Sequence, residues 1–168
     1  MDFWDILDKY GEKTGKTTPD NSKLQQGEYH RIVHVWIADQ NGEFLIQKKA
    51  NQDLWCITSG AVMHDENSLS AAIRSTANEL GLLLRADKLR KIKQTRNTTE
   101  FIDVWSASGT REDFFPVILC SEIVDVCWAS RNALVEMINR NEFVRYDYMD
   151  TVAGYLSGIP AKTGGKAF

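Results

Sequence analysis

The sequence predicts one α/β domain in which helices flank a mixed β-sheet. Three observations carry this prediction. Two β-rich runs flank the turn at Asn41-Gly42, apolar residues recur at helical spacing over residues 68–80, and a strand pattern over 123–130 leads directly into a second helical pattern. Helices and sheets that each carry an apolar face bury those faces against one another. An α+β arrangement of the same elements stays open from these patterns alone.

The chain before the first helix is mainly extended. Short apolar alternation, interrupted by Gly11 and Gly15, predicts an N-terminal hairpin over residues 3–16 and then a polar loop over 17–29. An Asn-Gly pair between two β-rich runs is the strongest short-range signal for a hairpin. The predicted strands after the loop are residues 30–38, residues 43–49 and a short strand over 54–62 that ends in a Ser-Gly bend.

The helix over residues 68–80 is the best-defined element. One face carries its apolar residues, and Asn67 or Ser68 can cap its start while Gly81 follows its end. The members of the apolar face are Leu69, Ala72, Ile73, Thr76 and Leu80. Later predicted elements are strands over 89–97, 99–108, 114–120 and 123–130, helices over 130–141 and 145–157, and a loose tail over 158–168.

Composition excludes several classes of function. The 168 residues carry a formal net charge of −3 and a sequence pI near 5.6, which argues against a nucleic acid polymer or an anionic membrane as partner. The sequence has no apolar run of the roughly 18 residues that a membrane span needs. Three cysteines at unrelated spacings favour a reduced, cytoplasmic protein.

Residues 60–82 carry the functional signal. The order is a glycine, five residues, a glutamate, seven residues, an arginine, four residues, a glutamate, one residue, a glycine and an aliphatic residue. This spacing resembles the Nudix box, G-x5-E-x7-R-E-U-x-E-E-x-G-U, in which U is aliphatic. The matching residues are Gly60, Glu66, Arg74, Glu79, Gly81 and Leu82. Ser75 and Asn78 replace two box glutamates, and Thr76 stands in the first aliphatic slot, so the box is degenerate.

The resemblance continues on both sides of the box. Residues 28–50 are similar to the strand pair that precedes the box in Nudix proteins, and residues 122–138 to the strand and helix that follow it. Residues 4–16 resemble the opening hairpin of the subgroup closest to isopentenyl-diphosphate isomerase. The family resemblance implies a single Nudix domain over residues 1–168, with an α/β/α sandwich, a mixed sheet and a loop-helix-loop motif.

Nudix proteins are known as hydrolases of a nucleoside diphosphate linked to another group, assisted by Mg²⁺ or Mn²⁺. Divalent ions neutralise the phosphate oxygens and bind through oxygen ligands. A helical wheel places Arg74, Ser75, Asn78 and Glu79 opposite the apolar face, on the arc that would aim three glutamates at a metal. That arc now displays a hydroxyl, an amide and one carboxylate. Because losing a general base alone costs about 10²–10⁴-fold in rate, we expect weakened turnover.

The resemblance implies roles for particular residues. Glu79 and Glu66 would serve catalysis and bind metal, with Arg74 as a third member of the catalytic set. The Ser59 carbonyl and Glu122 would complete the metal ligands. Simpler interpretations stand beside these roles. Glu66 can hold its loop together, Arg74 can brace that loop, and Glu79 can be a solvated acid at a helix end.

Outside the box, Lys49 is the positional match to a basic residue near the substrate phosphates, although it can equally be a plain surface residue. Since successive strand residues point opposite ways, only one of Lys48 and Lys49 can line a pocket. His30 and His34 lie four residues apart on a strand and face the same side, with burial the simpler interpretation. The core, rather than a ligand platform, is the expected place of Trp36, Trp55, Trp105 and Trp128.

Two functions follow from this pattern. The first is a Nudix-type hydrolase with weakened activity, acting on a small nucleotide or diphosphate. The second is a catalytically lapsed binding module for a nucleotide, a diphosphate or a protein. The resemblance leaves a homodimer open. Isomerisation is disfavoured, because Ser59 and Ala61 occupy the places of the isomerase cysteine and histidine that flank Gly60, and Cys56 is out of register.

Overall fold

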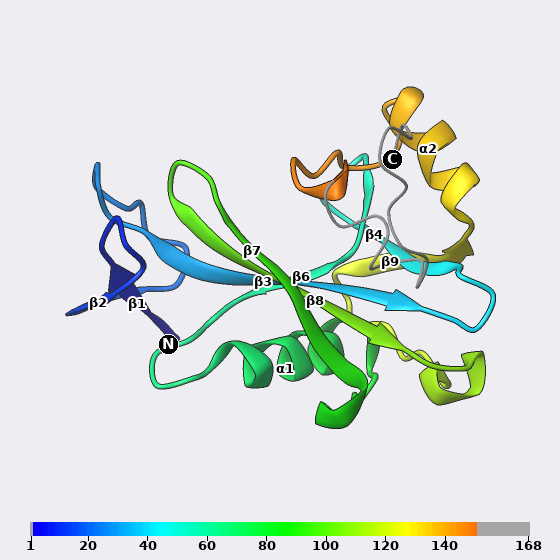
Figure 1. Ribbon diagram of the computed structural model, residues 1–168, viewed down its shortest axis with the longest axis horizontal. Coiled ribbons are helices and arrows are strands. Elements are labelled where there is room, and N and C mark those ends of the chain that lie inside the picture. The colour runs from blue at the N-terminus through cyan, green and yellow to red at the C-terminus, as the bar shows by residue number, and fades with distance from the viewer. Residues whose placement is uncertain (1, 151–168) are drawn as a thin grey trace.

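The computed structural model describes residues 2–150 as one layered arrangement of strands and helices (Figure 1). Two α-helices are present in this part of the chain, α1 (Ser68–Leu80) and α2 (Arg131–Asn139). Short 3₁₀ turns span Ala86–Lys88 and Arg111–Phe114. The strands are β1 (Phe3–Leu7), β2 (Lys13–Pro19), β3 (His30–Ala38), β4 (Phe44–Lys49), β5 (Trp55–Cys56), β6 (Thr58–Ala61), β7 (Leu89–Arg96), β8 (Glu100–Ser108) and β9 (Ile123–Ala129).

The main sheet is mixed. Its path runs β5-β4-β3-β8-β7, with β6 also paired to β3 and β9 to β4, and only the β3–β8 pair among these is parallel. The β3–β4 hairpin turns at Gly42, as the Asn-Gly pair predicts, with Ala38 opposite Phe44. Beyond that hairpin end, β3 pairs with β6 while β4 pairs with β5 and β9. The sheet therefore divides into two arms, which separate towards the start of β3 and the end of β4.

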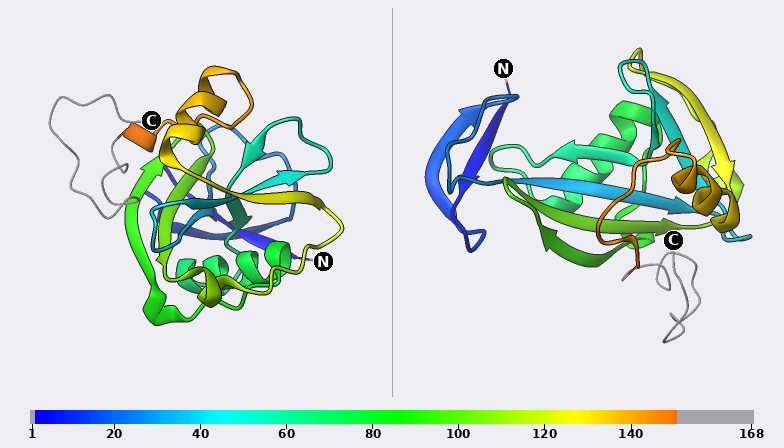
Figure 2. Two further views of the ribbon diagram at one scale, coloured as in Figure 1. Left: turned by 90° about the vertical axis from the view of Figure 1, so that its right-hand side faces the viewer. Right: turned by 90° about the horizontal axis from the view of Figure 1, so that it is seen from above.

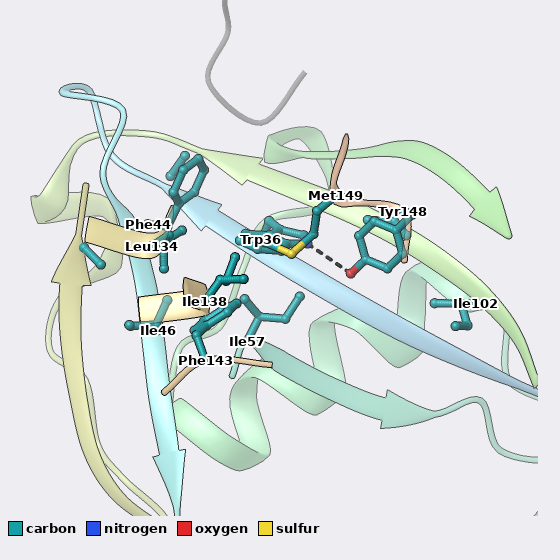
Figure 3. Packing of buried hydrophobic residues seen from close by; sticks show 13 residues of the cluster. Trp36, Phe44, Ile46, Ile57, Ile102, Leu134, Ile138, Phe143, Tyr148 and Met149 are labelled. Carbon is teal, nitrogen blue, oxygen red and sulfur yellow. Dashed lines mark hydrogen bonds between the residues drawn. The ribbon is translucent and has the colours of Figure 1, made fainter. Parts of the chain in front are cut away.

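Each face of the sheet is covered by one helix. Side chains alternate along β3, so Val33, Val35 and Ile37 join the core under α1, whereas Trp36 and Ala38 join the core under α2. Figure 2 shows α1 and α2 on opposite sides of the strands. Figure 3 shows the second core, where Trp36 Nε1 donates a hydrogen bond of 3.2 Å to Tyr148 Oη. The predicted α/β/α sandwich with a mixed sheet is confirmed.

The N-terminal hairpin forms a separate two-stranded sheet at one end of the molecule (Figures 1 and 2). Strand β2 extends to Pro19, so the loop predicted from residue 17 begins later. Leu7 N donates to Tyr29 O at 2.7 Å, and Trp4 forms a bridge with Met63. These contacts hold β1 against the start of β3 and the loop that precedes α1.

The predicted strand over residues 114–120 is wrong. This segment forms no strand, because its amides serve the end of α1 instead. Ile118 N donates to Leu80 O at 2.8 Å and Cys120 N to Glu79 O at 3.3 Å, which satisfies carbonyls that a helix end otherwise leaves open. Pro116 has no amide hydrogen to contribute to a ladder.

Three smaller predictions also differ from the structure. The Ser59-Gly60 pair is not a bend but lies inside β6, paired with His34 and Val33 of β3. Residues 145–148 form no helix, residues 149 and 150 are helical, and the remainder of the helix predicted over 145–157, like the tail over 158–168, lies outside the described residues. Within residues 2–150, no helix has the length and apolar character needed to cross a membrane.

Candidate functional site

Helix α1 and the loop before it are fixed by local hydrogen bonds. Asn67 Oδ1 caps the helix by accepting from Ser70 N at 2.9 Å. Gly81 ends it in the left-handed region with φ of 66°, and a Cβ at this position would lie 2.8 Å from the Ile118 Cβ. Both caps follow the sequence prediction. They set the rotation of α1, and hence which of its side chains meet the sheet.

Glu66 is held by Arg74. Arg74 Nε and Nη2 each donate to one carboxylate oxygen of Glu66 at 2.8 Å, and Nη2 also donates to Ala61 O at 2.6 Å. The Met63 amide adds a third hydrogen bond to Glu66. Burial acts to raise the pKa of Glu66, but these hydrogen bonds outweigh it and the pKa is lowered. The pair therefore braces the loop before α1.

Glu79 is held by residues of β4. Lys49 Nζ lies 2.6 Å from one carboxylate oxygen, and Gln47 Nε2 donates to the other at 2.7 Å. The Ser59 amide reaches the same second oxygen at 3.4 Å. Burial acts to lower the pKa of Lys49, but attraction to Glu79 outweighs it and the pKa is raised. The charge of this carboxylate is thus balanced within the chain.

Ser75 departs from the helical-wheel prediction. It lies on the predicted arc, yet it is buried, with 3% of its surface exposed. The cause is the close approach of α1 to β6 at Gly60, where an added Cβ would lie 2.9 Å from the Ser75 Cβ. Two members of the predicted apolar face, Leu69 and Ile73, are only half-buried. The face of α1 that the sheet buries is therefore rotated towards Ser75, relative to the face that the apolar periodicity predicts.

A cavity of about 400 Å³ lies where α1, the main sheet and the N-terminal hairpin meet. We call it the candidate cavity. It brings together the four box positions on α1, Arg74, Ser75, Asn78 and Glu79, with Lys49 from β4. The other lining residues are Trp4, Asp20, Asn21, His30, Ile32, Ser59, Gly60, Ala61, Met63 and Glu100. Lys48 is not part of this lining, and neither are Glu66 and Glu122.

Trp4 and His30 form one wall of the candidate cavity. Their rings stack with centroids 4.1 Å apart and an interplanar angle of 24°. His30 Nε2 lies 3.4 Å from a carboxylate oxygen of Glu100. This hydrogen bond is the main factor that lowers the pKa of Glu100, while burial acts in the opposite direction. Trp4 Nε1 and His30 Nδ1 are buried and have no hydrogen-bond partner among the described residues, and the same holds for Ser75 Oγ.

Comparison with known proteins identifies the family. The Nudix domain model matches residues 28–151, which is most of the chain. The chain belongs to the Nudix domain family. An uncharacterized Nudix hydrolase of Listeria innocua is 28% identical over 156 residues, covering 89% of this chain and 92% of the relative. Dihydroneopterin triphosphate diphosphatase of Haemophilus influenzae is 25% identical over 122 residues, covering 63% of this chain and 76% of that enzyme.

Solved structures show the same fold. The crystal structure of DR0079 from Deinococcus radiodurans aligns with a TM-score of 0.73 at 18% identity, covering 89% of this chain and 96% of that one. The alignment reaches most of the described residues, which confirms the predicted Nudix fold. The matched domain begins at residue 28, so the hairpin that carries Trp4 lies outside it.

Nudix hydrolases generally use divalent metals, and the residues of this Nudix domain do not fit one well. Over residues 2–150, no three His, Cys, Asp or Glu side chains gather into a group that could hold a metal ion. Glu66 is bound to Arg74, Glu79 to Lys49, and Glu122 is exposed with its carbonyl accepting from Ala50 N. Ser59 lines the candidate cavity, but its amide is directed to Glu79. Of the four predicted metal ligands, Ser59 and Glu79 lie together at the candidate cavity, whereas Glu66 and Glu122 do not line it.

Two residues of the candidate cavity region escaped the sequence analysis. Gln47 is buried in β4 and contacts Glu79 across a separation of 32 residues, so no local spacing reveals it. Trp4 reaches the cavity from the N-terminal hairpin. Trp4 lies next to a turn-rich segment with weak periodicity. The sequence offered only one indication of its position, an aromatic residue that alternates with a polar one on a short strand.

Proposed function

We propose that this Nudix domain binds a nucleotide-type small molecule in the candidate cavity and hydrolyses it weakly or not at all. Of the two functions that the sequence leaves open, the lapsed binding module has the stronger support. The relatives named as hydrolases and diphosphatases support a phosphorylated small molecule as the ancestral substrate class. A homodimer, a cytoplasmic location and the isomerase-like subgroup stay predictions from the sequence.

The state of Glu79 carries the proposal. It is the one box acid left on the arc of α1, and an ammonium group already lies 2.6 Å from it. A divalent ion at this carboxylate would have to displace Lys49 or be repelled by it at short range. Ser75 and Asn78 supply no compensating charge, since a hydroxyl and an amide are neutral ligands. The arc therefore lacks the anionic ligands that would hold a divalent ion for attack on a diphosphate.

The test is release of nucleoside monophosphate, followed by chromatography, from a panel of nucleoside diphosphate derivatives with Mg²⁺ or Mn²⁺, beside thermal shifts with the same compounds. We expect stabilisation by at least one compound and release at the background rate. The variant Ser75→Glu with Asn78→Glu should gain metal-dependent turnover of about 10²-fold or more over the natural chain.

A matched control adds the same two negative charges at positions outside the candidate cavity. Ser70→Glu with Asn132→Glu adds two carboxylates at exposed helix positions away from the candidate cavity and should leave release at background. Metal-dependent turnover by the natural chain that is lost in Glu79→Gln would overturn the proposal. That outcome would restore the weakened hydrolase as the function.

A further inference from the structure

Each arm of the main sheet has an outer strand, β7 beside β8 and β9 beside β4, and these two edge strands differ in charge. Strand β7 has no acid and four cations, Arg90, Lys91, Lys93 and Arg96, and its register with β8 shifts between Lys91 and Lys93. Cationic side chains and bulges on an edge strand oppose pairing with another chain. Strand β9 has one charged residue, Asp125. The edge at β9 is therefore the less protected of the two.

The outward side of β9 follows from the hydrogen bonds of the β3–β4 hairpin. A backbone hydrogen bond within the hairpin directs the carbonyl of Glu43 towards β3. Backbone groups alternate in direction along a strand, so the next residue, Phe44, faces β9, where it pairs with Ala129. The same alternation along β9 turns the backbone groups of Trp128 and Val126 away from β4.

These outward groups meet no other strand within residues 2–150. Strand β9 pairs with β4 alone, and the Val126 amide donates to the Asp125 side chain at 2.8 Å. Figure 2 shows β9 at the end of the molecule opposite the N-terminal hairpin. Its pairing with β4 is regular over residues 125–129. A regular edge strand with little charge and outward backbone groups is a template for a further strand.

The edge of β9 is complementary to itself. In antiparallel pairing about a two-fold axis at Cys127, residues 125–129 pair over their full length with the same residues of a second copy. Val126 then lies opposite Trp128 of the second copy, and these outward-facing residues exchange backbone hydrogen bonds. Asp125 lies opposite Ala129, so the one acid of the strand meets no like charge. An axis at Asp125 would instead place two carboxylates face to face.

Exposed apolar side chains lie at the start of this edge. Val124 on β9 is 57% exposed, and Ile118 and Leu119, in the segment that leads into β9, are 65% and 37% exposed. Single exposed apolar residues are ordinary, whereas several along one segment mark a contact surface. A specific dimer buries about 1,200 Å² or more in total, so side chains beside the paired strands must contribute to it. These three residues are placed to do so.

We infer that this chain forms a two-fold homodimer through β9, in which the strand pairs antiparallel with β9 of a second copy about Cys127 and the two main sheets become one. The four cations of β7 oppose the same pairing at the other edge. No residue of β9 lines the candidate cavity, so the inference goes beyond the proposed function and does not depend on it.

Sedimentation velocity of the full chain in the presence of a reductant tests the inference. We expect a monomer–dimer equilibrium over a concentration range of about 1–100 µM. Cys127→Lys changes an exposed side chain and places two ammonium groups opposite each other across the axis, so it should weaken the dimer at least about tenfold. Ser108→Lys, which adds the same charge at an exposed position at the end of β8, is the matched control and should leave the dimer unchanged.

Oxidation tests the register. Opposite residues of a pair that exchanges no backbone hydrogen bonds have Cα atoms about 4.5 Å apart, which is within the range of a disulfide. Diamide as the oxidant should therefore link two copies of the natural chain through Cys127. Non-reducing electrophoresis should show no linked dimer for Cys127→Ser, and an undiminished one for Cys120→Ser.

Three outcomes would overturn the inference. The first is a natural chain that stays monomeric at about 100 µM, and slow amide exchange at Val126 and Trp128 in that monomer would mean that the chain itself covers the edge. The second is a dimer that Cys127→Lys leaves unchanged, which would place the interface on another surface. The third is a disulfide-linked dimer that persists in Cys127→Ser. The proposed function stands in all three cases, because none of these measurements involves the candidate cavity.

Discussion

Two cavities of this protein are lined by neighbouring residues of the segment before α1, and they differ in how their buried polar groups are hydrogen-bonded. The first, of about 550 Å³, surrounds Asp103, which is 1% exposed. Its carboxylate accepts from Arg31 at 3.0 Å, from Lys91 at 2.8 Å and from Gln94 at 2.8 Å. Burial acts to raise the pKa of Asp103, yet these partners outweigh it and the pKa is lowered. The candidate cavity is smaller, and three buried side-chain atoms of its lining residues have no hydrogen-bond partner among the described residues.

The difference lies in how completely the buried polar groups are hydrogen-bonded within the chain. A buried charge whose hydrogen bonds are all made within the chain stabilises the fold and offers nothing to a ligand. A buried polar atom without a partner costs stability instead. The larger cavity therefore surrounds a structural network, whereas the smaller one holds the box residues on which the proposed function rests.

The largest effect should come from Asp103→Ala. Arg31 and Lys91 would lose their shared partner in a mostly buried place, so we expect the free energy of unfolding to fall by about 3 kcal/mol. Urea denaturation measures the change. Asp87→Ala, which removes an exposed carboxylate paired with Arg85, is the matched control and should change little. An unchanged urea midpoint for Asp103→Ala would show that the Asp103 network does not stabilise the fold, and would contradict the distinction between the two cavities.

The second effect concerns His34, whose Nδ1 lies 2.7 Å from Tyr148 Oη. Burial lowers the pKa of His34 to about 4, Glu100 acts to raise it, and Lys49 acts to lower it further. In the unfolded chain this ring binds a proton near pH 6.5. The unfolded state therefore gains protons first as the pH falls, and the free energy of unfolding should drop by about 2 kcal/mol between pH 7 and pH 5.

Denaturation at several pH values checks this dependence. In His34→Gln the slope between pH 7 and pH 5 should largely vanish, whereas His64→Gln, at an exposed histidine, should retain it. A slope that persists in His34→Gln would show that the proton uptake belongs to another group.

A third, smaller effect is expected at the boundary between the cavities. Glu66 lines the Asp103 cavity, while its partner Arg74 lines the candidate cavity. Glu66→Gln keeps the shape but removes the charge, and should lower the free energy of unfolding by about 1–2 kcal/mol. If Arg74 holds Glu66 in place of a metal, the loss should be the same with EDTA or with Mg²⁺. A loss that appears only with Mg²⁺ would assign Glu66 to a metal site.

The smallest effect has the opposite sign. Ser75→Ala removes a buried hydroxyl that has no partner among the described residues, so the free energy of unfolding should stay level or rise by up to about 1 kcal/mol. Ser106→Ala serves as the comparison, since the Ser106 hydroxyl is buried but is not one of the three atoms without a partner, and should bring no gain. A clear loss of stability in Ser75→Ala would place its hydroxyl in a hidden network and remove it from the candidate cavity.

Local signals predicted much of the fold. The caps at Asn67 and Gly81 and the Asn-Gly hairpin depend on a few adjacent residues, and the structure has them where the sequence predicts them. The strand predicted over residues 114–120 was wrong, although the apolar composition of this segment is typical of a strand. Its amides donate hydrogen bonds to the end of α1, which is a contact between distant parts of the chain. Composition gives no information on such a contact.

The candidate site was predictable only in part. Box spacing indicates that Arg74, Ser75, Asn78 and Glu79 share an arc of the helix, and all four line the candidate cavity. Spacing cannot reveal which residue from another element pairs with the Glu79 carboxylate on that arc. The pairing of Glu79 with Lys49 depends on where β4 lies against α1, and the stacking of Trp4 on His30 depends on how the N-terminal hairpin folds back.

The most direct test of the account is a calorimetric titration of the natural chain with MgCl₂. If Lys49 balances Glu79 in place of a metal, no binding tighter than about 1 mM should be detected, and Ser75→Glu with Asn78→Glu should bring it into range. Stoichiometric Mg²⁺ binding by the natural chain, tighter than about 1 mM and lost in Glu79→Gln, would contradict it.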